Sequence, residues 1–248
     1  MRILLTNDDG IFAPGLAALY KRLVAIGNVT VVAPTEGWSG ASHSITFAEP
    51  LACMKVSIEG LFTGFGVHGS PADCVKLAAM ELHRGPIDLV VAGINHGANV
   101  GINVYYSGTV AAAMEAAFLR IPSVALSVAA EEHTDFERAA EHGIAVLKRL
   151  LPLQAGDVMN VNVPLLSAGK PRGVRVVPQA TSGFHETGEF VFRLAGGAPR
   201  AEKEPADTTT LADGYITVTP LKPDMTDHKK ALALKAKLDA EPGAQRDV

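Results

Sequence analysis

The sequence begins MRILLTNDDG (residues 1–10), an apolar run that ends abruptly in two carboxylates and a glycine. A short apolar run bounded by turn residues is typical of a strand buried on both faces in a parallel sheet. Asp8 and Asp9 then follow the carboxyl end of this strand, which is the edge where open α/β sheets bind ligands. Gly10 permits the turn that would let both carboxylates face one ligand.

Two neighbouring carboxylates repel each other unless a cation lies between them. A site made of oxygen ligands alone favours a hard ion such as Mg²⁺ or Mn²⁺. The same residues are also compatible with a solvated acidic turn that caps a helix, and the stretch by itself leaves both interpretations open.

Beyond this stretch, strand-like and helix-like segments alternate as far as Pro164, which predicts an α/β fold with a mostly parallel sheet. Ser70-Pro-Ala-Asp73 is typical of a capped helix start. After Pro164 the pattern changes to short strands separated by prolines and glycines, which indicates hairpin extensions and a tail. The predicted strands are 1–6, 28–33, a hairpin over 51–67, 87–93, 122–128, 157–163, 174–177, 190–194 and 215–219, and the predicted helices are 16–26, 70–82, 110–118, 136–151 and 227–238.

Two further loops follow predicted strands, at residues 34–44 (PTEGWSGASHS) and 94–109 (INHGANVGINVYYSGT). We expect them to converge with the Asp8 turn at one sheet edge. Asp8, Asp9, the hydroxyl of Ser39 and the amide oxygen of Asn95 would then form an oxygen half-shell for one divalent ion.

The second of these loops ends in Ser107-Gly108-Thr109 at a predicted helix start, where free N–H groups and the helix dipole favour an anion such as phosphate. None of the three loops contains lysine or arginine. A bound phosphate would therefore depend on the ion and on backbone N–H groups, which suits a monoester better than a polyanion.

Each of these residues also has a structural interpretation. Ser39 and Ser44 can be turn formers, and Asn95 can occupy a left-handed turn. His43, His68 and His96 lack metal-ligand spacing, and His43 is the best candidate for an acid or supporting role.

The composition argues against several classes of protein. The formal net charge of −4 predicts no basic surface for a nucleic-acid duplex, and no apolar run is long enough to span a membrane. Asp8 and Asp9 interrupt the N-terminal apolar run, so it does not look like a signal peptide and we expect a cytoplasmic protein. Cys53 and Cys74 have neither metal-ligand nor disulfide spacing, and we expect both to be buried thiols.

Several motifs together resemble the SurE survival protein family of metal-dependent 5'-nucleotidases. The resemblance covers nearly the whole chain, through TNDDG, GWSGASHSIT, GSPADCV, AGINHGANVG, YSGTVAAAMEA and DGYITVTPLKPDMTD. It implies a Rossmann-like three-layer core (1–180) and a hairpin extension with an oligomerisation tail (181–248), in a single domain that forms homodimers or homotetramers.

The resemblance also implies the chemistry. One Mg²⁺ or Mn²⁺ per subunit would be held by Asp8, Asp9, Ser39 and Asn95, with Asp8, Asp9 and Asn95 catalytic. The substrate-binding residues would be Ser107, Gly108, Thr109, Gly40 and His43. The expected substrates are nucleoside monophosphates, including 3'-nucleotides, and short polyphosphate.

The sequence does not decide whether water or Asp8 attacks phosphorus, although water is favoured because Asp8 already serves the ion. Two other classes of function stay open. One is a metal-dependent deacetylase, which wants a histidine where Asn7 stands, and the other is a non-catalytic nucleotide sensor.

Overall fold

The structure, a computed structural model, describes residues 1–83, 85–181 and 205–239. The described strands form one nine-stranded sheet in the order β3-β4-β2-β1-β5-β6-β7-β9-β8. The elements are β1 (Arg2–Thr6), α1 (Pro14–Leu23), β2 (Asn28–Pro34), β3 (Cys53–Ile58), β4 (Phe62–Val67), α2 (Pro71–Leu77), η1 (Ala78–Leu82), β5 (Leu89–His96), η2 (Ile102–Tyr105), α3 (Gly108–Phe118), β6 (Ser123–Val128), α4 (Phe136–Leu150), β7 (Val158–Val163), β8 (Val174–Val176), α6 (Asp207–Ala212), β9 (Ile216–Leu221) and α7 (His228–Asp239).

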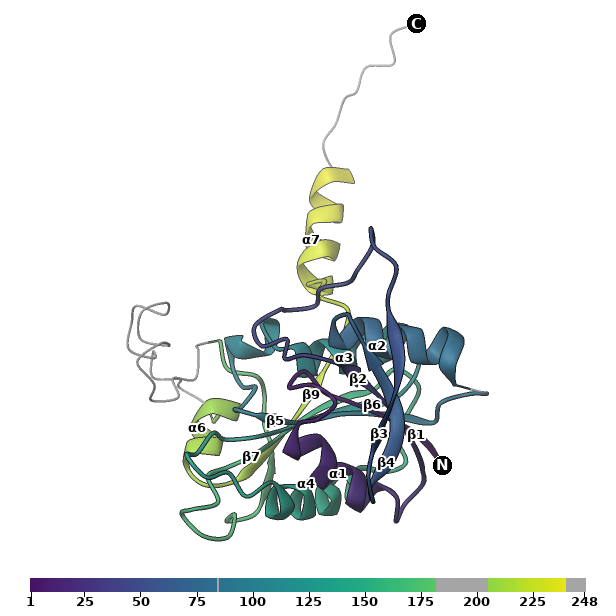
Figure 1. The fold of residues 1–248 in the computed structure, drawn as a ribbon. Coiled ribbons are helices and arrows are strands. Elements are labelled where there is room, and N and C mark those ends of the chain that lie inside the picture. The colour runs from purple at the N-terminus through teal and green to yellow at the C-terminus, as the bar shows by residue number, and fades with distance from the viewer. Residues whose placement is uncertain (84, 182–204, 240–248) are drawn as a thin grey trace, which may run out of the picture.

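The sheet is the middle layer of three, which confirms the predicted α/β fold. Helices α2 and α3 cover one face, and α1 and α4 cover the other (Figure 1). Alternate residues of β1 serve the two faces: Leu4 packs on the α2 and α3 side, whereas Ile3 and Leu5 pack on the α1 and α4 side. Because both faces are covered, the central strands carry apolar residues on both faces, as their sequences predicted.

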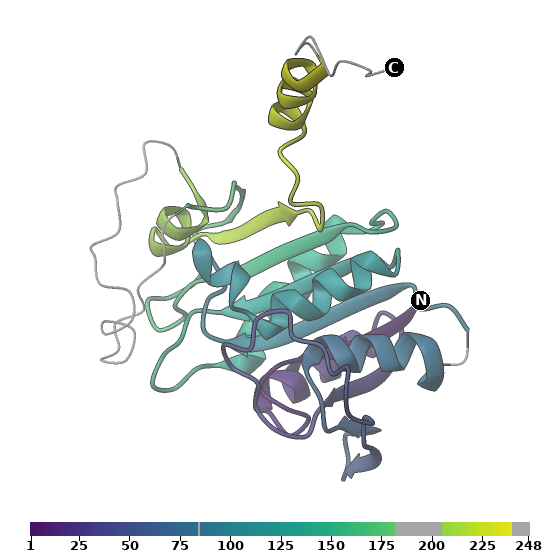
Figure 2. The same cartoon turned by 90° about the horizontal axis from the view of Figure 1, so that it is seen from above.

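The side on which the chain adds successive strands to the sheet changes between β1 and β5. From β1 the chain continues to β2 on one side, whereas β5 continues through α3 to β6 on the other side (Figure 2). All of these pairs are parallel, so their carboxyl ends share one edge of the sheet. Such a topological switch point creates a crevice where doubly wound proteins bind ligands.

Strand β5 is longer than predicted. It runs to His96 rather than ending near Gly93, so Asn95 and His96 belong to the strand and not to the loop after it. Its register with β6 shifts between Gly93 and Asn95. Gly93 has a φ of 139°, and a Cβ there would lie 2.2 Å from the carbonyl oxygen of Leu126. The register shift near the end of β5 therefore requires glycine at position 93.

The C-terminal part differs from the expected hairpin extensions. Strand β9 pairs antiparallel with β7 and parallel with β8, so residues 216–221 are part of the central sheet. The local pattern revealed the strand but not its partner β7, whose paired residues lie 55 to 63 positions earlier in the chain. The short helix α6 was not predicted, and the predicted strand 190–194 lies outside the described residues.

Smaller differences occur elsewhere. The predicted helix 70–82 begins with the expected cap at Ser70, whose hydroxyl accepts from Asp73 N at 3.0 Å, but it ends in the π-helical turn η1. Cys74 is buried as predicted, whereas Cys53 is exposed at the start of the edge strand β3, so that prediction was wrong. Among the described helices, none has the length and apolar character needed to cross a bilayer.

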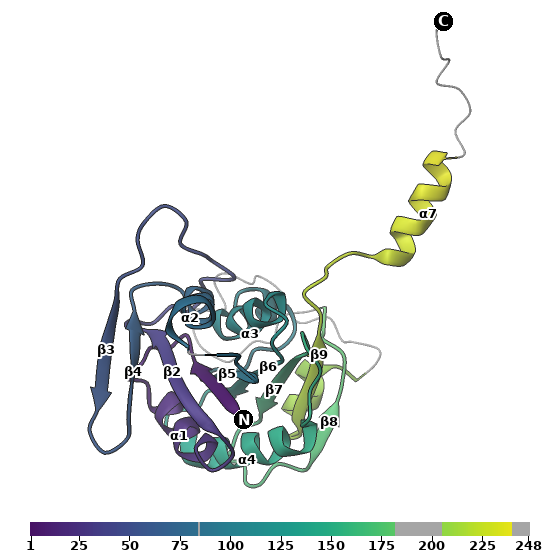
Figure 3. The same ribbon diagram turned by 90° about the vertical axis from the view of Figure 1, so that its right-hand side faces the viewer.

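Helix α7 stands away from the rest of the molecule. Figures 1 and 3 show it projecting beyond the sheet on an extended segment that follows β9. None of its residues is buried, and it leaves apolar side chains in solvent at Leu232, Leu234 and Leu238.

Candidate active site

Backbone hydrogen bonds join the three predicted loops at the carboxyl edge. Trp38 N donates to Asp8 O at 2.8 Å, which fixes loop 34–44 beside the Asp8 turn. Ser42 N donates to Tyr106 O at 3.0 Å, which fixes the same loop against loop 94–109. The loops therefore converge as expected, around the switch point between β1 and β5.

Asp8 is buried, with 4 % of its surface exposed, and α3 holds its carboxylate. Thr109 donates twice, from its hydroxyl to Oδ1 at 2.5 Å and from its backbone N–H to Oδ2 at 3.0 Å. Burial, the largest cause, and the neighbouring charge of Asp9 together raise the pKa of Asp8 to about 6, although both hydrogen bonds from Thr109 favour the charged form.

Asp9 is held by the end of β5. His96 N donates to its Oδ2 at 3.2 Å. Burial raises the pKa of this carboxyl also, and the His96 N–H opposes the rise. The turn itself is tied by Asn7, whose Nδ2 donates to Gly10 O at 2.8 Å. The two carboxylates are thus anchored from opposite sides, Asp8 by α3 and Asp9 by β5.

Asn95, at the end of β5, and Ser39, in loop 34–44, are the other two predicted ligands. The Nδ2 of Asn95 donates to Gly97 O at 2.6 Å, so its amide oxygen is the atom that remains to meet a cation. Ser39 is exposed, one residue beyond the Trp38 anchor. Gly40 follows with a φ of 71°, and the space around its Cα is open.

The start of α3 is less available to an anion than the sequence suggested. Thr109 N donates to Asp8, and Val110 N donates to the hydroxyl of Ser107 at 3.1 Å. In the described part of the chain, Gly108 N has no protein acceptor and is the first-turn N–H that a phosphate oxygen can meet. Gly108 itself contacts Asp8: a Cβ there would lie 2.9 Å from Asp8 Cβ and 3.2 Å from its Oδ2.

His43 is tied to a buried acid on α3. Its Nε2 lies 3.0 Å from Glu115 Oε2, and its ring stacks on Phe118 with the centroids 5.7 Å apart. Glu115 is only 7 % exposed. The sequence analysis did not single it out, although a glutamate within the apolar run VAAAMEAAF was a signal that could have found it. The structure therefore places His43 beside α3, where it orients the loop that carries Ser39.

The residues fit a hard cation. Asp8 and Asp9 are adjacent carboxylates with raised pKa values, and among the described residues neither forms an ion pair with lysine or arginine. A divalent ion would stabilise the charged carboxylate that burial disfavours, and it would also offset the smaller repulsion from Asp9. In the described part of the chain, no three His, Cys, Asp or Glu side chains come together as ligands. A cation here would therefore need the neutral oxygens of Asn95 and Ser39 as well.

A polar network that the sequence analysis missed supports the turn after β5. Asn99 N donates to Asn162 Oδ1 at 2.8 Å, and Asn99 Nδ2 donates to Ser127 Oγ at 2.9 Å. Asn160 Nδ2 donates to Asn99 O at 2.7 Å. These side chains are buried beneath the loop. The polar residues in the strand DVMNVNV were the available signal, because asparagine in a buried strand needs partners.

Fold and site together define a doubly wound α/β protein with a paired-carboxylate ligand site at the switch point of its sheet. Residues 3–186 match the model of the family described as Survival protein SurE. The chain belongs to the SurE family.

Curated relatives are similar over most of their length. The chain is 43 % identical over 240 residues to the 5'-nucleotidase SurE of Syntrophobacter fumaroxidans, covering 92 % of this chain and 96 % of the relative. It is 41 % identical over 257 residues to the 5'-nucleotidase SurE of Aeromonas hydrophila, covering 97 % and 100 %. The crystal structure of SurE protein from Aquifex aeolicus superposes with a TM-score of 0.81 at 34 % identity, covering 96 % and 100 %.

Proposed function

We propose that this protein is a 5'-nucleotidase, a phosphoric monoester hydrolase that converts nucleoside monophosphates to nucleoside and phosphate. The observation that carries the proposal is the Asp8 and Asp9 pair at the switch point, held by α3 and β5 without a basic partner among the described residues. The names of the curated relatives supply the reaction. By the same resemblance, 3'-nucleotides and short polyphosphate are further substrates.

One Mg²⁺ or Mn²⁺ per subunit belongs to this proposal, with Asp8, Asp9, Asn95 and Ser39 as its ligands. When bound, the ion supplies Lewis acidity and neutralises charge on the phosphoryl group. The protein's own contribution is preorganisation. Thr109 fixes both oxygens of Asp8, and the bond to Gly97 orients Asn95 with its oxygen outward.

Gly108 lies against Asp8, and in this proposal its N–H, which has no acceptor among the described residues, donates to a phosphate oxygen. The Thr109 N–H already donates to Asp8, and the Ser107 hydroxyl accepts from Val110 N, so in this proposal both residues also support that helix start. We assign the attack on phosphorus to water, because Asp8, which Thr109 holds through both oxygens, already serves as a ligand of the proposed ion.

A homodimer or homotetramer also belongs to the proposal. Helix α7 leaves Leu232, Leu234 and Leu238 exposed, and an apolar tail that its own subunit does not cover is suited to packing on an identical subunit. We place the protein in the cytoplasm and expect no membrane and no nucleic-acid duplex among its partners, consistent with its net charge of −4.

The test is phosphate release from a panel of nucleoside monophosphates, with and without a chelator, in the wild type and in Asp9→Asn. We expect the chelator to abolish release and Mg²⁺ or Mn²⁺ to restore it. Asp9→Asn should lower the rate by roughly 100-fold or more, because even residues outside the ligand shell of a metal site commonly cost 10- to 100-fold. Thermal unfolding should show that the fold is retained.

The matched control is Asp213→Asn, at an exposed carboxylate next to α6. Its rate should stay at the wild-type value. Wild-type turnover in Asp9→Asn would exclude the proposed site. Nucleotide binding without phosphate release by the wild type would instead indicate a non-catalytic sensor.

A further inference from the structure

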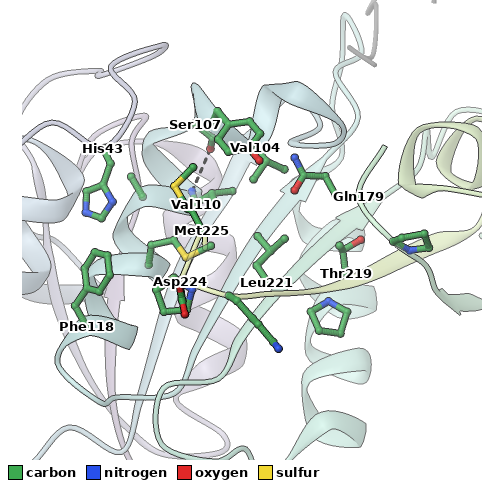
Figure 4. A pocket seen from close by; sticks show the side chains of 17 residues that line it. His43, Val104, Ser107, Val110, Phe118, Gln179, Thr219, Leu221, Asp224 and Met225 are labelled. Atoms are coloured by element: carbon green, nitrogen blue, oxygen red, sulfur yellow. Dashed lines mark hydrogen bonds between the residues drawn. The ribbon is translucent and has the colours of Figure 1, made fainter. Parts of the chain in front are cut away.

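A cavity of about 500 Å³ opens beside the candidate active site (Figure 4). One wall is the side of α3 and η2 that carries Val104, Tyr105, Ser107, Val110 and Met114. The opposite wall is formed by residues 178–179 and by the chain from 219 to 225 as it leaves β9. The size is typical of small-molecule sites, which span about 300–1,000 Å³.

The cavity is continuous with the site loops. Its lining includes Ser107, which caps α3, and His43, which belongs to the loop that carries Ser39. Ser107 immediately precedes Gly108, whose Cα lies against Asp8. A phosphate at Asp8 and Gly108 N would therefore lie next to a residue that lines the cavity, so its ester substituent could extend into the cavity. A second cavity, of about 270 Å³ beside α2, shares no residue with the site loops.

The lining has the chemistry of a site for a flat, partly polar group. Tyr105 is 57 % exposed, so its ring is open to contact, and Val110 and Met114 add an apolar floor. Polar groups line both walls: His43 and Ser107 lie on the side of the site loops, and Gln179, Lys222 and Asp224 lie on the opposite side. Gln179 is one of them: its Nε2 donates to Gly101 O at 2.8 Å, which leaves its amide oxygen as an acceptor. Lys222 adds a cationic donor.

We propose that this cavity binds the nucleoside part of the substrate, with Tyr105 as the residue that favours nucleotides over phosphate esters without a base. The inference rests on the proposed function. It adds what the carboxylate site alone does not provide, namely a reason why the esters of nucleosides are preferred. Aromatic side chains bind bases by stacking, which tolerates different bases because every base has a flat face.

The test compares two substrates in two variants. Tyr105→Ala and the matched control Tyr106→Ala are assayed with adenosine 5'-monophosphate and with glycerol 3-phosphate, which has no base. Tyr106 is 55 % exposed but does not line the cavity, and its backbone carbonyl, which accepts from Ser42 N, remains in the variant.

We expect Tyr105→Ala to raise the KM for adenosine 5'-monophosphate about tenfold, the scale of one base–aromatic stack. The kcat for this substrate and both constants for glycerol 3-phosphate should stay within about twofold, because stacking binds ground state and transition state alike. Tyr106→Ala should change none of these values. Titration of the wild type and of Tyr105→Ala with adenosine, followed by calorimetry, gives a readout that does not depend on turnover. Binding should weaken by a similar factor.

The outcomes separate the two claims. If the wild type hydrolyses both esters with the same KM and binds no adenosine, the cavity inference fails and the proposed function stands. If the wild type releases phosphate from no ester yet binds adenosine through Tyr105, the proposed function fails and the cavity assignment stands. An equal rise in KM for both esters would overturn the role of Tyr105. A fall in the native mass of Tyr105→Ala without any change in its KM would show that the cavity instead contacts a second copy of the chain.

Discussion

Thr109 orients Asp8 with two different donors, a hydroxyl that its side chain supplies and an N–H that its position at the start of α3 supplies. The hydroxyl can be removed without disturbing the N–H. Thr109→Val keeps the shape of the side chain and leaves Oδ1 of a buried carboxylate without this donor.

We expect Thr109→Val to lower stability by about 1.5–3 kcal/mol, the usual value of a hydrogen bond to a charged group. Affinity for the divalent ion should fall by roughly 10- to 100-fold, because residues that orient metal ligands have effects of that size. Mn²⁺ titration followed by calorimetry measures the second effect. Thr109→Ser is the control, since it restores the hydroxyl. Equal affinities in Val and Ser variants would show that the hydroxyl does not position Asp8.

Gly108 lies so close to Asp8 that any side chain must displace it. The Cβ of Gly108→Ala would sit 2.9 Å from Asp8 Cβ, an atom that cannot rotate away because it is fixed to the end of β1. The helix propensity gained is at most about 1 kcal/mol and does not offset a shift of the strand end.

Hydrolysis of every phosphate ester should therefore fall alike in Gly108→Ala, with a higher KM whatever the leaving group. Kinetics with adenosine 5'-monophosphate and glycerol 3-phosphate measure this. Gly37→Ala, where a Cβ meets nothing within 4 Å, should behave as wild type. A loss restricted to the nucleotide would mean that Gly108 contacts the nucleoside instead of maintaining the carboxylate.

At this scale the sequence revealed Asp8, Asp9, Ser39 and Asn95 as candidates, because polar residues directly after buried strands stand out. It did not reveal that Thr109 contacts Asp8, 101 residues away in the chain. A helix start predicts free N–H groups, but only the fold shows which acceptor lies in front of them.

At the scale of elements, the short helix α6 fastens the turn after β5. Asp207 is fully buried at the start of α6, and its carboxylate accepts from Gly101 N at 3.0 Å and from Ala180 N and Thr208 N, each at 2.8 Å. The carboxylate therefore joins the loop that follows Asn95 to two segments near the end of the sheet.

Asp207→Ala should lower the free energy of unfolding by about 3 kcal/mol or more, because it leaves several buried N–H donors without an acceptor at roughly 1–3 kcal/mol each. Urea unfolding measures the change. Asp213→Ala, at the exposed end of the same helix, should stay within about 0.5 kcal/mol of wild type. If the two variants were equally stable, the bonds to Asp207 would contribute nothing measurable to holding the loop.

The predicted element boundaries were accurate where neighbouring residues determine them and incomplete where a distant strand does. Strands β1, β2, β6 and β7 and helix α4 were predicted to within about two residues, because apolar periodicity is a property of neighbouring positions. The continuation of β5 to His96 depends on β6 as a partner, and the place of β9 depends on β7. Neither partner can be read from the segment itself, so both predictions were incomplete.

At the scale of the whole molecule, the part proposed to bind the ion and the part proposed to hold subunits together are separate. Every predicted ion ligand precedes residue 110, whereas α7 begins at His228 and none of its residues is buried against the body of the chain. Loss of the tail should therefore affect assembly first.

Deleting residues 226–248 should lower the native mass measured by sedimentation and leave Mn²⁺ affinity within about twofold. The reason is that the exposed leucines of α7 supply apolar area only if another subunit covers them. Lys237→Ser, a polar change on the same helix, is the control and should keep the native mass. A truncated protein of unchanged mass would exclude the tail from assembly, and a monomeric full-length protein would remove the proposal of an oligomer.

The way α3 holds Asp8 has a consequence for the end of the reaction. An enzyme that binds the phosphate group through free helix N–H groups and basic side chains also binds its product, inorganic phosphate, tightly. Here Thr109 N and Val110 N are already occupied, and the three site loops contain no lysine or arginine. If the proposed ion is bound, we expect inorganic phosphate to be held chiefly through it. Product inhibition should accordingly be weak and should rise and fall with the concentration of the divalent cation.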